Sequence, residues 1–143
     1  IVVLGFSFKA NTNDTRESAA IQICKDLLDE GAILKIHDPK VDPKQIEIDL
    51  DQKENKQIKE FKDKTHTLNE GGWCSTKNII DASKGADAIV VLTDWDEYLE
   101  LDWEEISRQL RQPGWVFDTR SLIPIDKIKK LNLKFWRIGD GSQ

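Results

Sequence analysis

Two stretches of this chain place side chains suited to anion binding a few residues after apolar runs. Phe8 and Lys9 follow the run at 1–4, and Arg120 follows the run at 115–117. An ammonium group and a planar guanidinium both bind phosphates, and an aromatic ring beside them suits a base or a sugar. Most lysines are surface residues that bind no ligand. Together, however, Phe8, Lys9 and Arg120 predict a nucleotide site.

The loop after the first apolar run has the position of a dinucleotide fingerprint without its chemistry. A Rossmann fingerprint, G-x-G-x-x-G, supplies glycines so that backbone N–H groups can approach a pyrophosphate. Here only Gly5 is present, and two aromatic residues and a lysine follow within four positions. We therefore expect side chains, rather than bare backbone, to contact the ligand.

Arg16 is a further candidate for binding an anion. Asp14 and Glu17 have the spacing of a capping box, which predicts a helix that begins near Asp14 and holds Arg16 in its first turn. A cation is unfavourable at the positive end of the helix dipole, so this position indicates an anionic partner. An ion pair with Asp14 or Glu17 explains Arg16 equally well.

The other polar candidates favour structural roles. His37 ends an apolar run without a nucleophile near it in sequence, which is more typical of a hydrogen-bonded residue than of a catalytic base. The side chain of Trp95 can either line the ligand crevice or cover the hydrophobic core, and the role in the core is favoured. Asp118 stands two residues before Arg120 and can orient its guanidinium.

The two cysteines, Cys24 and Cys74, have neither a metal-type spacing nor the number that a disulfide framework needs. Cys24 falls on the apolar face of an expected helix, and no cationic neighbour marks Cys74 as a thiolate. We expect no metal site, no catalytic cysteine and a reduced, cytoplasmic setting.

Length and charge limit the class of protein. A chain of 143 residues can form one domain with its own core. A net charge of -5, without a long block of one sign, argues against nucleic-acid binding through a positive field. No apolar run approaches the roughly 18 residues that cross a bilayer. Since methionine is absent even at position 1, we expect a piece of a larger protein.

Strand-like runs alternate with helical patterns along most of the chain. The alternation predicts a three-layer, Rossmann-like α/β fold, with a parallel sheet, helices on both faces and no G-x-G-x-x-G fingerprint. The loops that carry Lys9 and Arg120 would share the carboxyl edge of that sheet. Strands are expected at 1–4, 33–37, 88–92, 115–117 and 134–138, and helices at about 14–30, 76–84, 102–110 and 125–131.

Residues 41–72 interrupt this alternation. Residues 46–50 alternate like an edge strand, and the mixed charges of 51–64 favour a solvated helix face over a binding patch. Gly71 and Gly72 would let the chain turn back. We expect a polar surface insertion within a single domain, 1–143.

Five motifs occur in order at the expected ends of elements. They are GFSFK at 5–9, DTRES at 14–18, HDPK at 37–40, TDW at 93–95 and FDTR at 117–120. This ordered set resembles the C-terminal UDP-binding domain of the UDP-glucose 6-dehydrogenases, in the UDP-glucose/GDP-mannose dehydrogenase family. The resemblance covers nearly the whole chain.

The resemblance implies an NAD-dependent enzyme that oxidises UDP-glucose to UDP-glucuronate in two steps, with two NAD⁺ and a covalent thiohemiacetal on a cysteine. It implies that NAD is bound mainly by an N-terminal domain, that N-terminal and central domains of the same protein are partners, and that the whole assembles as a homo-oligomer. The nucleophilic cysteine has no counterpart here, so the isolated chain is expected to be inactive.

The resemblance also implies residue roles. The counterparts of Phe8, Lys9 and Arg120 contact UDP-glucose, and the counterpart of Arg16 reaches NAD⁺. One motif departs from the family, which usually has glycine and paired arginines after the aspartate, whereas this chain has Thr119, Arg120 and Ser121. The second arginine of the family pattern is therefore missing from this chain.

Two alternatives remain open. The same domain occurs in UDP-N-acetylmannosamine dehydrogenases, and a nucleotide-binding or assembly module without chemistry would also lack the cysteine. Three tryptophans, Trp73, Trp103 and Trp136, are taken as exposed and could anchor an interface, although core or cover is at least as well favoured.

Overall fold

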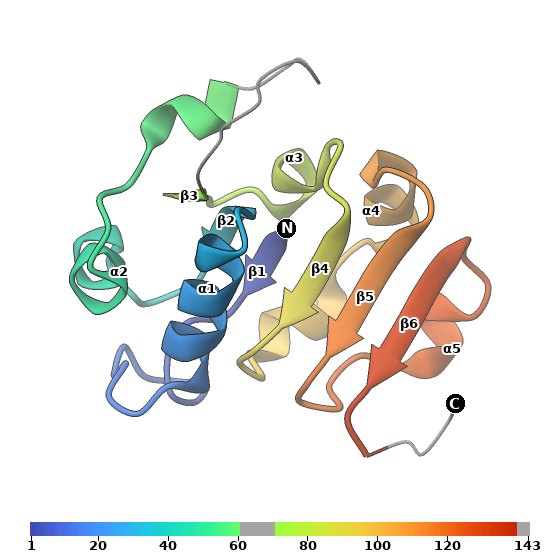
Figure 1. Ribbon diagram of the computed structural model, residues 1–143. Coiled ribbons are helices and arrows are strands. Elements are labelled where there is room, and N and C mark those ends of the chain that lie inside the picture. Colours follow the sequence, from blue (N-terminus) through green and yellow to red (C-terminus); the bar gives the residue numbers. More distant parts are fainter. Residues whose placement is uncertain (61–70, 140–143) are drawn as a thin grey trace.

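The computed structural model describes residues 1–60 and 71–139, and they form a six-stranded parallel sheet with the order β3-β2-β1-β4-β5-β6 (Figure 1). The expected Rossmann-like α/β fold is confirmed. The strands are β1 Val2–Leu4, β2 Ile33–His37, β3 Gly72–Ser75, β4 Ala88–Val91, β5 Gly114–Asp118 and β6 Leu133–Arg137. No described helix has the length and apolar character needed to cross a bilayer.

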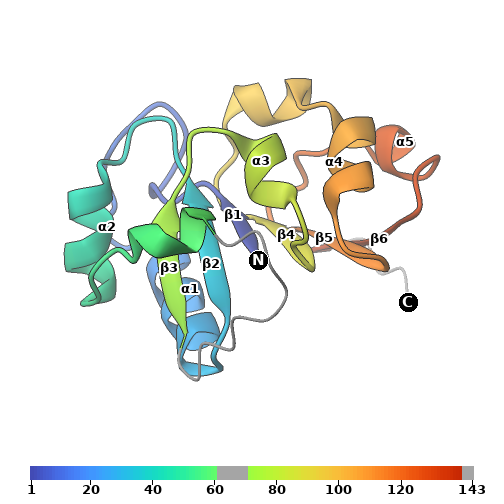
Figure 2. The ribbon, with the colours of Figure 1, turned by 90° about the horizontal axis from the view of Figure 1, so that it is seen from above.

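Helices cover both faces of the sheet. Figure 2 shows α1 on one side and α3, α4 and α5 on the other. The helices are α1 Ala19–Asp29, α2 Pro43–Leu50, α3 Ile79–Ser83, α4 Trp103–Gln109 and α5 Ile125–Ile128, with single 3₁₀ turns at Lys56–Glu60 and Asp96–Glu100. Each layer encloses its own hydrophobic core against the sheet.

Strand β1 lies at the centre of the fold because its side chains are apolar on both faces. Val2, Val3 and Leu4 are all fully buried. Val3 packs in the core beneath α1 and α2, whereas Val2 and Leu4 pack in the opposite core, as the two-residue period of a strand requires. Strand β1 pairs in parallel with β2 and β4.

Helix α1 begins later than the capping-box pattern predicts. Ser18 is its N-cap and accepts a hydrogen bond from the backbone N–H of Ala20, at 3.3 Å. Glu17 has a φ of 58°, which a right-handed helix cannot contain. The expected helix start at Asp14 is therefore wrong, and Arg16 lies in the turn before α1 rather than in its first turn.

Residues 46–50 form helix α2 and not the expected edge strand. Asp42 caps this helix by accepting from the N–H of Lys44 at 2.8 Å, and proline occupies its first position. Ile46 and Leu50, four residues apart, are buried, whereas Ile48 is 72% exposed. The alternating pattern was ambiguous because positions 46 and 50 share a face in a helix as well as in a strand.

The chain after α2 supplies an edge strand that the sequence did not reveal. Strand β3 pairs in parallel with β2, and both Trp73 and Cys74 are buried in it. Its four residues begin with Gly72, the second glycine of a pair that favoured a turn. Residues 41–60 therefore lead from β2 to a further strand of the sheet, and 61–70 lie outside the described residues.

The tryptophans expected to be exposed differ in burial. Trp73 and Trp103 are buried, so that expectation is wrong for both, while Trp136 on β6 is 44% exposed. The indole N–H of Trp73 donates to the carbonyl of Gln52 at 2.9 Å, which joins β3 to the segment after α2. Trp95 is buried, as the sequence favoured.

Candidate functional site

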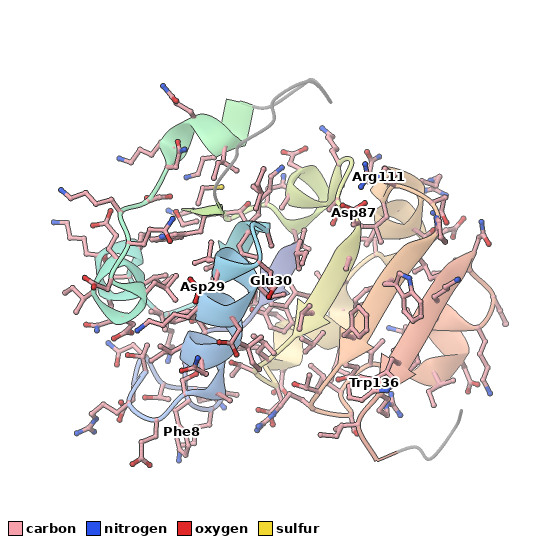
Figure 3. All side chains as sticks on the ribbon, viewed as in Figure 1. Phe8, Asp29, Glu30, Asp87, Arg111 and Trp136 are labelled. Carbon is pink, nitrogen blue, oxygen red and sulfur yellow. The ribbon has the colours of Figure 1, made fainter. Side chains whose placement is uncertain are left out.

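The strand order reverses between β1 and β4, which is where open α/β sheets bind ligands. The chain leaves β1 toward β2 and leaves β4 toward β5, so the loops after β1 and β4 separate at this point. In Figure 3, Phe8 lies at the carboxyl edge of the sheet, while Asp87 and Arg111 lie at the opposite edge. The candidate site is built from the loops that follow β1, β2, β4 and β5.

The loop after β1 has a fixed backbone and exposed side chains. Gly5 has a φ of 92°, and its N–H donates to the carbonyl of His37 at 2.8 Å. Ser7 is buried and its hydroxyl donates to the carbonyl of Lys9 at 2.9 Å. Phe8 is 50% exposed and Lys9 is also exposed. The loop therefore presents an aromatic ring and an ammonium group to a ligand.

The carboxylate of Asp38, at the end of β2, holds this loop. Its Oδ2 accepts from the backbone N–H groups of Phe6 at 2.8 Å and Ser7 at 3.0 Å. Its Oδ1 accepts from those of Lys40 and Val41, both at 2.9 Å. One side chain thus joins the loops after β1 and β2.

Asp38 also determines that the β1 loop does not fit a dinucleotide pyrophosphate. A Rossmann site offers free backbone N–H groups after its first strand. Here the N–H groups of Phe6 and Ser7 are already bonded to Asp38, which adds a negative charge where a pyrophosphate would approach. That side chains contact the ligand in place of these backbone groups, as expected from the missing glycines, stays a prediction.

The end of β4 connects the β1 loop with the β5 loop. The hydroxyl of Thr93 donates to the carbonyl of Ser7 at 2.8 Å. The next residue, Asp94, accepts from Nη2 of Arg120 at 3.2 Å. The loops of Lys9 and Arg120 therefore contact consecutive residues of one strand end, and the two cationic candidates share one edge of the sheet.

Asp118 shapes the Arg120 loop through the backbone. It is fully buried, and its carboxylate accepts from the N–H groups of Arg120 at 3.1 Å, Leu122 at 3.2 Å and Ile123 at 2.8 Å. The expectation that Asp118 orients the guanidinium of Arg120 is wrong, since Asp94 is the carboxylate that this guanidinium contacts. The guanidinium of Arg137 lies 3.4 Å from Asp118 and offsets its buried charge.

Arg16 lies on the flank of the site. Its Nη2 is 2.7 Å from Oδ2 of Asp14, so one of the two expected ion pairs is present. The hydrogen bonds from Arg16 lower the pKa of Asp14 to about 2. A shallow hollow beside this pair reaches Gln45 of α2, on the β2 side of the sheet. The side chain of Arg16 remains 88% exposed despite this ion pair.

His37 and Tyr98 form a buried polar pair behind the β1 loop. Nδ1 of His37 lies 3.0 Å from the hydroxyl of Tyr98, and that hydroxyl is also 3.2 Å from the carbonyl of His37. Burial lowers the pKa of His37 and raises that of Tyr98. The geometry is that of a hydrogen-bonded strand end, which the sequence favoured over a catalytic base.

Both cysteines are inaccessible. Cys24 and Cys74 are buried with free thiols, and burial raises the pKa of Cys24 to about 12. Burial also raises the pKa of Cys74. Neither thiol has the exposure or the acidity of a nucleophile.

Sequence reasoning missed the two residues that organise this site. Asp38 directly follows β2 in the HDPK motif, and Asp94 stands three residues past the end of β4 in the TDW motif; these positions at strand ends were the available signal. Their partners are more than twenty residues away in sequence, so the local pattern did not reveal the contacts.

A sequence profile described as "UDP-glucose/GDP-mannose dehydrogenase family, UDP binding domain" matches residues 2–125. The chain belongs to this family. The match runs from β1 into α5 and so includes every strand-end loop of the candidate site. The resemblance carried by the five motifs is confirmed.

Two curated relatives are similar to this chain in sequence. The UDP-glucose 6-dehydrogenase of Drosophila melanogaster is 36% identical to it over 143 residues. UDP-glucose 6-dehydrogenase 4 of Arabidopsis thaliana is 35% identical over 147 residues. The matches cover 100% and 97% of this chain but 29% of each relative. The chain spans less than a third of the length of these relatives.

A solved structure confirms the fold independently. A UDP-D-ManNAc dehydrogenase from Pyrococcus horikoshii superposes with a TM-score of 0.60 over 94% of this chain and 24% of its own. Sequence identity is 23%, so this likeness concerns the fold. The UDP-N-acetyl-mannosamine dehydrogenase Cap5O of Staphylococcus aureus gives a TM-score of 0.58 at 17% identity, over 97% of this chain and 26% of its own.

Proposed function

We propose that this chain is the UDP-sugar-binding domain of an NAD-dependent UDP-glucose 6-dehydrogenase. The whole enzyme would convert UDP-glucose, two NAD⁺ and water to UDP-glucuronate, two NADH and protons. The observation that carries the proposal is the shared sheet edge, where the loops of Lys9 and Arg120 both attach to the end of β4. The relatives at 35% and 36% identity, both named as UDP-glucose 6-dehydrogenases, support this substrate.

We assign the diphosphate of the ligand to Lys9 and Arg120. Both side chains are exposed cations on loops whose backbone is held in place by hydrogen bonds to carboxylate or hydroxyl groups. Phe8, beside Lys9, offers a ring for the uracil or sugar to pack against. Ser121 stands where the family usually has a second arginine, so Arg120 has to bind the phosphate without that neighbour.

The cofactor belongs elsewhere in the enzyme. NAD⁺ would accept the hydrides from the sugar, but the β1 loop of this chain does not fit its pyrophosphate because Asp38 already occupies the backbone N–H groups. We assign NAD⁺ mainly to an N-terminal domain and propose that Arg16 reaches it. Arg16 is exposed beside a shallow hollow that reaches Gln45 of α2, which leaves its guanidinium accessible to a group of another domain.

The isolated chain should bind without catalysing. The two cysteines, Cys24 and Cys74, are buried away from the surface, and neither can act as the thiol nucleophile that adds to an aldehyde to form a thiohemiacetal. We propose that the nucleophile comes from the central part of the same protein. The buried free thiols fit a reduced, cytoplasmic setting, and we expect the full protein to be a homo-oligomer.

Calorimetric titration of UDP and UDP-glucose into the chain tests this proposal. Lys9→Ala and Arg120→Ala should each weaken binding about ten- to a hundredfold, since a charged hydrogen bond to a phosphate contributes about 1.5–3 kcal/mol. Lys84→Ala and Arg111→Ala are matched controls, because both residues are exposed, ion-paired cations away from the site. Unchanged affinity in Lys9→Ala and Arg120→Ala would refute the assignment.

The choice of sugar requires its own titration. The fold likeness to UDP-N-acetylmannosamine dehydrogenases, at identities of 17–23%, does not distinguish between the two sugars. Titration of UDP-glucose and UDP-N-acetylmannosamine against the same preparation compares them directly. We expect UDP-glucose to bind more tightly, and the reverse order would move the proposal to the other enzyme.

A further inference from the structure

Asp38 is the side chain on which the geometry of the candidate site converges. It stands one residue past β2 and contacts backbone groups after both β1 and β2. The indole N–H of Trp95, after β4, also approaches its Oδ2 at 3.3 Å. A single carboxylate therefore links the ends of three adjacent strands, which are ordered β2-β1-β4 in the sheet.

The contacts of Asp38 lie immediately before the residues that would bind the ligand. Its Oδ2 accepts from the N–H groups of Phe6 and Ser7, and Phe8 and Lys9 follow directly. Two neighbours complete the restraint on the backbone. The hydroxyl of Ser18 donates to the carbonyl of Phe6 at 2.8 Å, and the N–H of Phe8 donates to the carbonyl of Asp14 at 2.7 Å.

The chemistry of the contact matches a positioning role better than a contact with the ligand. Both carboxylate oxygens of Asp38 are already engaged by four backbone N–H groups, so neither is directed to an incoming phosphate. A negative charge would also repel that phosphate if it faced it directly. Asp38 can favour binding only through the loop that it holds.

We propose that Asp38 is the positioning residue of the UDP site, fixing the backbone of Phe6 and Ser7 so that Phe8 and Lys9 are ordered before the ligand arrives. This inference rests on the proposed function for its ligand, but the ordering of the loop does not. Preorganisation strengthens binding because the loop then loses less conformational entropy when the ligand binds.

The first measurement needs no ligand. In Asp38→Ala, amide hydrogen exchange at Phe6 and Ser7 should accelerate at least about tenfold relative to the wild type, while exchange in β1 stays slow. Asp102→Ala is the matched control, since Asp102 also accepts from a backbone N–H, that of Glu105 at 2.9 Å, but at the start of α4. Unchanged exchange at Phe6 and Ser7 in a folded Asp38→Ala variant would overturn the proposal.

The second measurement is a double-mutant cycle with UDP as the probe. Asp38→Ala should weaken UDP binding about tenfold, because residues of the loop must then be ordered on binding. In the Lys9→Ala background the same change should cost much less, since Asp38 acts through the residue already removed. Full additivity of the two losses would overturn the proposal, because a general structural defect would weaken both backgrounds equally.

A conservative variant covers the case in which Asp38→Ala does not fold. Asp38→Asn keeps one acceptor oxygen but presents donors to one of the two pairs of N–H groups, so faster exchange at either pair is expected. Slow exchange at both pairs would contradict the proposal. If the wild type binds no UDP, the proposed function fails, and the exchange rates still decide whether Asp38 fixes the loop.

Discussion

Gly5 packs so closely against Thr93 that a Cβ atom on Gly5 would lie only 2.7 Å from the backbone nitrogen of Thr93. This approach brings the start of the β1 loop against the end of β4. It also allows the Thr93 hydroxyl to reach the carbonyl of Ser7. Gly5, the single glycine of the loop after β1, therefore allows the strand ends to pack closely and does not serve the approach of a pyrophosphate.

Gly5→Ala should destabilise the fold by about 2–4 kcal/mol, because the new methyl group collides with backbone and the φ of 92° is strained for alanine. Urea unfolding measures the loss. Gly31→Ala is the control, since Gly31 has a φ of 84° but no atom within 4 Å of an added Cβ, and it should cost only about 1 kcal/mol. Equal losses in the two variants would contradict the role of close packing.

Asp94→Asn should strengthen UDP binding by up to about fivefold. The Arg120 guanidinium lies 3.2 Å from Asp94 in the free protein, and a phosphate has to compete for it. An exposed ion pair is worth roughly 0.2–1 kcal/mol, which sets the size of the gain. Titration of Asp87→Asn provides the control, because Asp87 pairs with Arg111 at the opposite edge. Weaker binding by Asp94→Asn would mean that Asp94 itself contacts the ligand.

The fold should lose stability as the pH falls from 7.5 to 5.5, in part through His37. Burial lowers its pKa in the folded state, against the raising effects of Glu97 and Asp38. The unfolded chain therefore takes up a proton near the ordinary pKa of about 6.5 before the folded chain does, and this uptake favours unfolding. Denaturation of wild type and His37→Gln across this range measures the effect. The variant should show a smaller decrease, and an equal decrease would exclude His37 as a source.

Ile46→Ala and Ile48→Ala test the helix that replaced the expected strand. Ile46 is 1% exposed and Ile48 is 72% exposed, so the first change should cost about 2–4 kcal/mol and the second at most about 0.5 kcal/mol. Chemical denaturation measures the free energy of unfolding of the two variants, which both replace one isoleucine by alanine. Similar losses would indicate an alternating strand, in which both side chains face the same side.

Much of the fold followed from local patterns in the sequence. The apolar run of Val2–Leu4 predicts a buried central strand because its side chains are hydrophobic on both faces, and Lys9 and Arg120 follow strands at positions that a parallel sheet brings to one edge. The start of α1 was misplaced because the capping-box spacing of Asp14 and Glu17 occurs in a turn, while Ser18 is tethered to the carbonyl of Phe6.

The sequence by itself determined the parallel α/β class, the strand ends that carry Phe8, Lys9 and Arg120, and the absence of a glycine-rich phosphate loop. Each of these depends on residues close together in the chain. Only the tertiary structure decided that Asp38 occupies the N–H groups of Phe6 and Ser7 and that Asp94 pairs with Arg120. Those contacts join residues that are distant in sequence, and their geometry exists only once the sheet has placed β2, β1, β4 and β5 side by side.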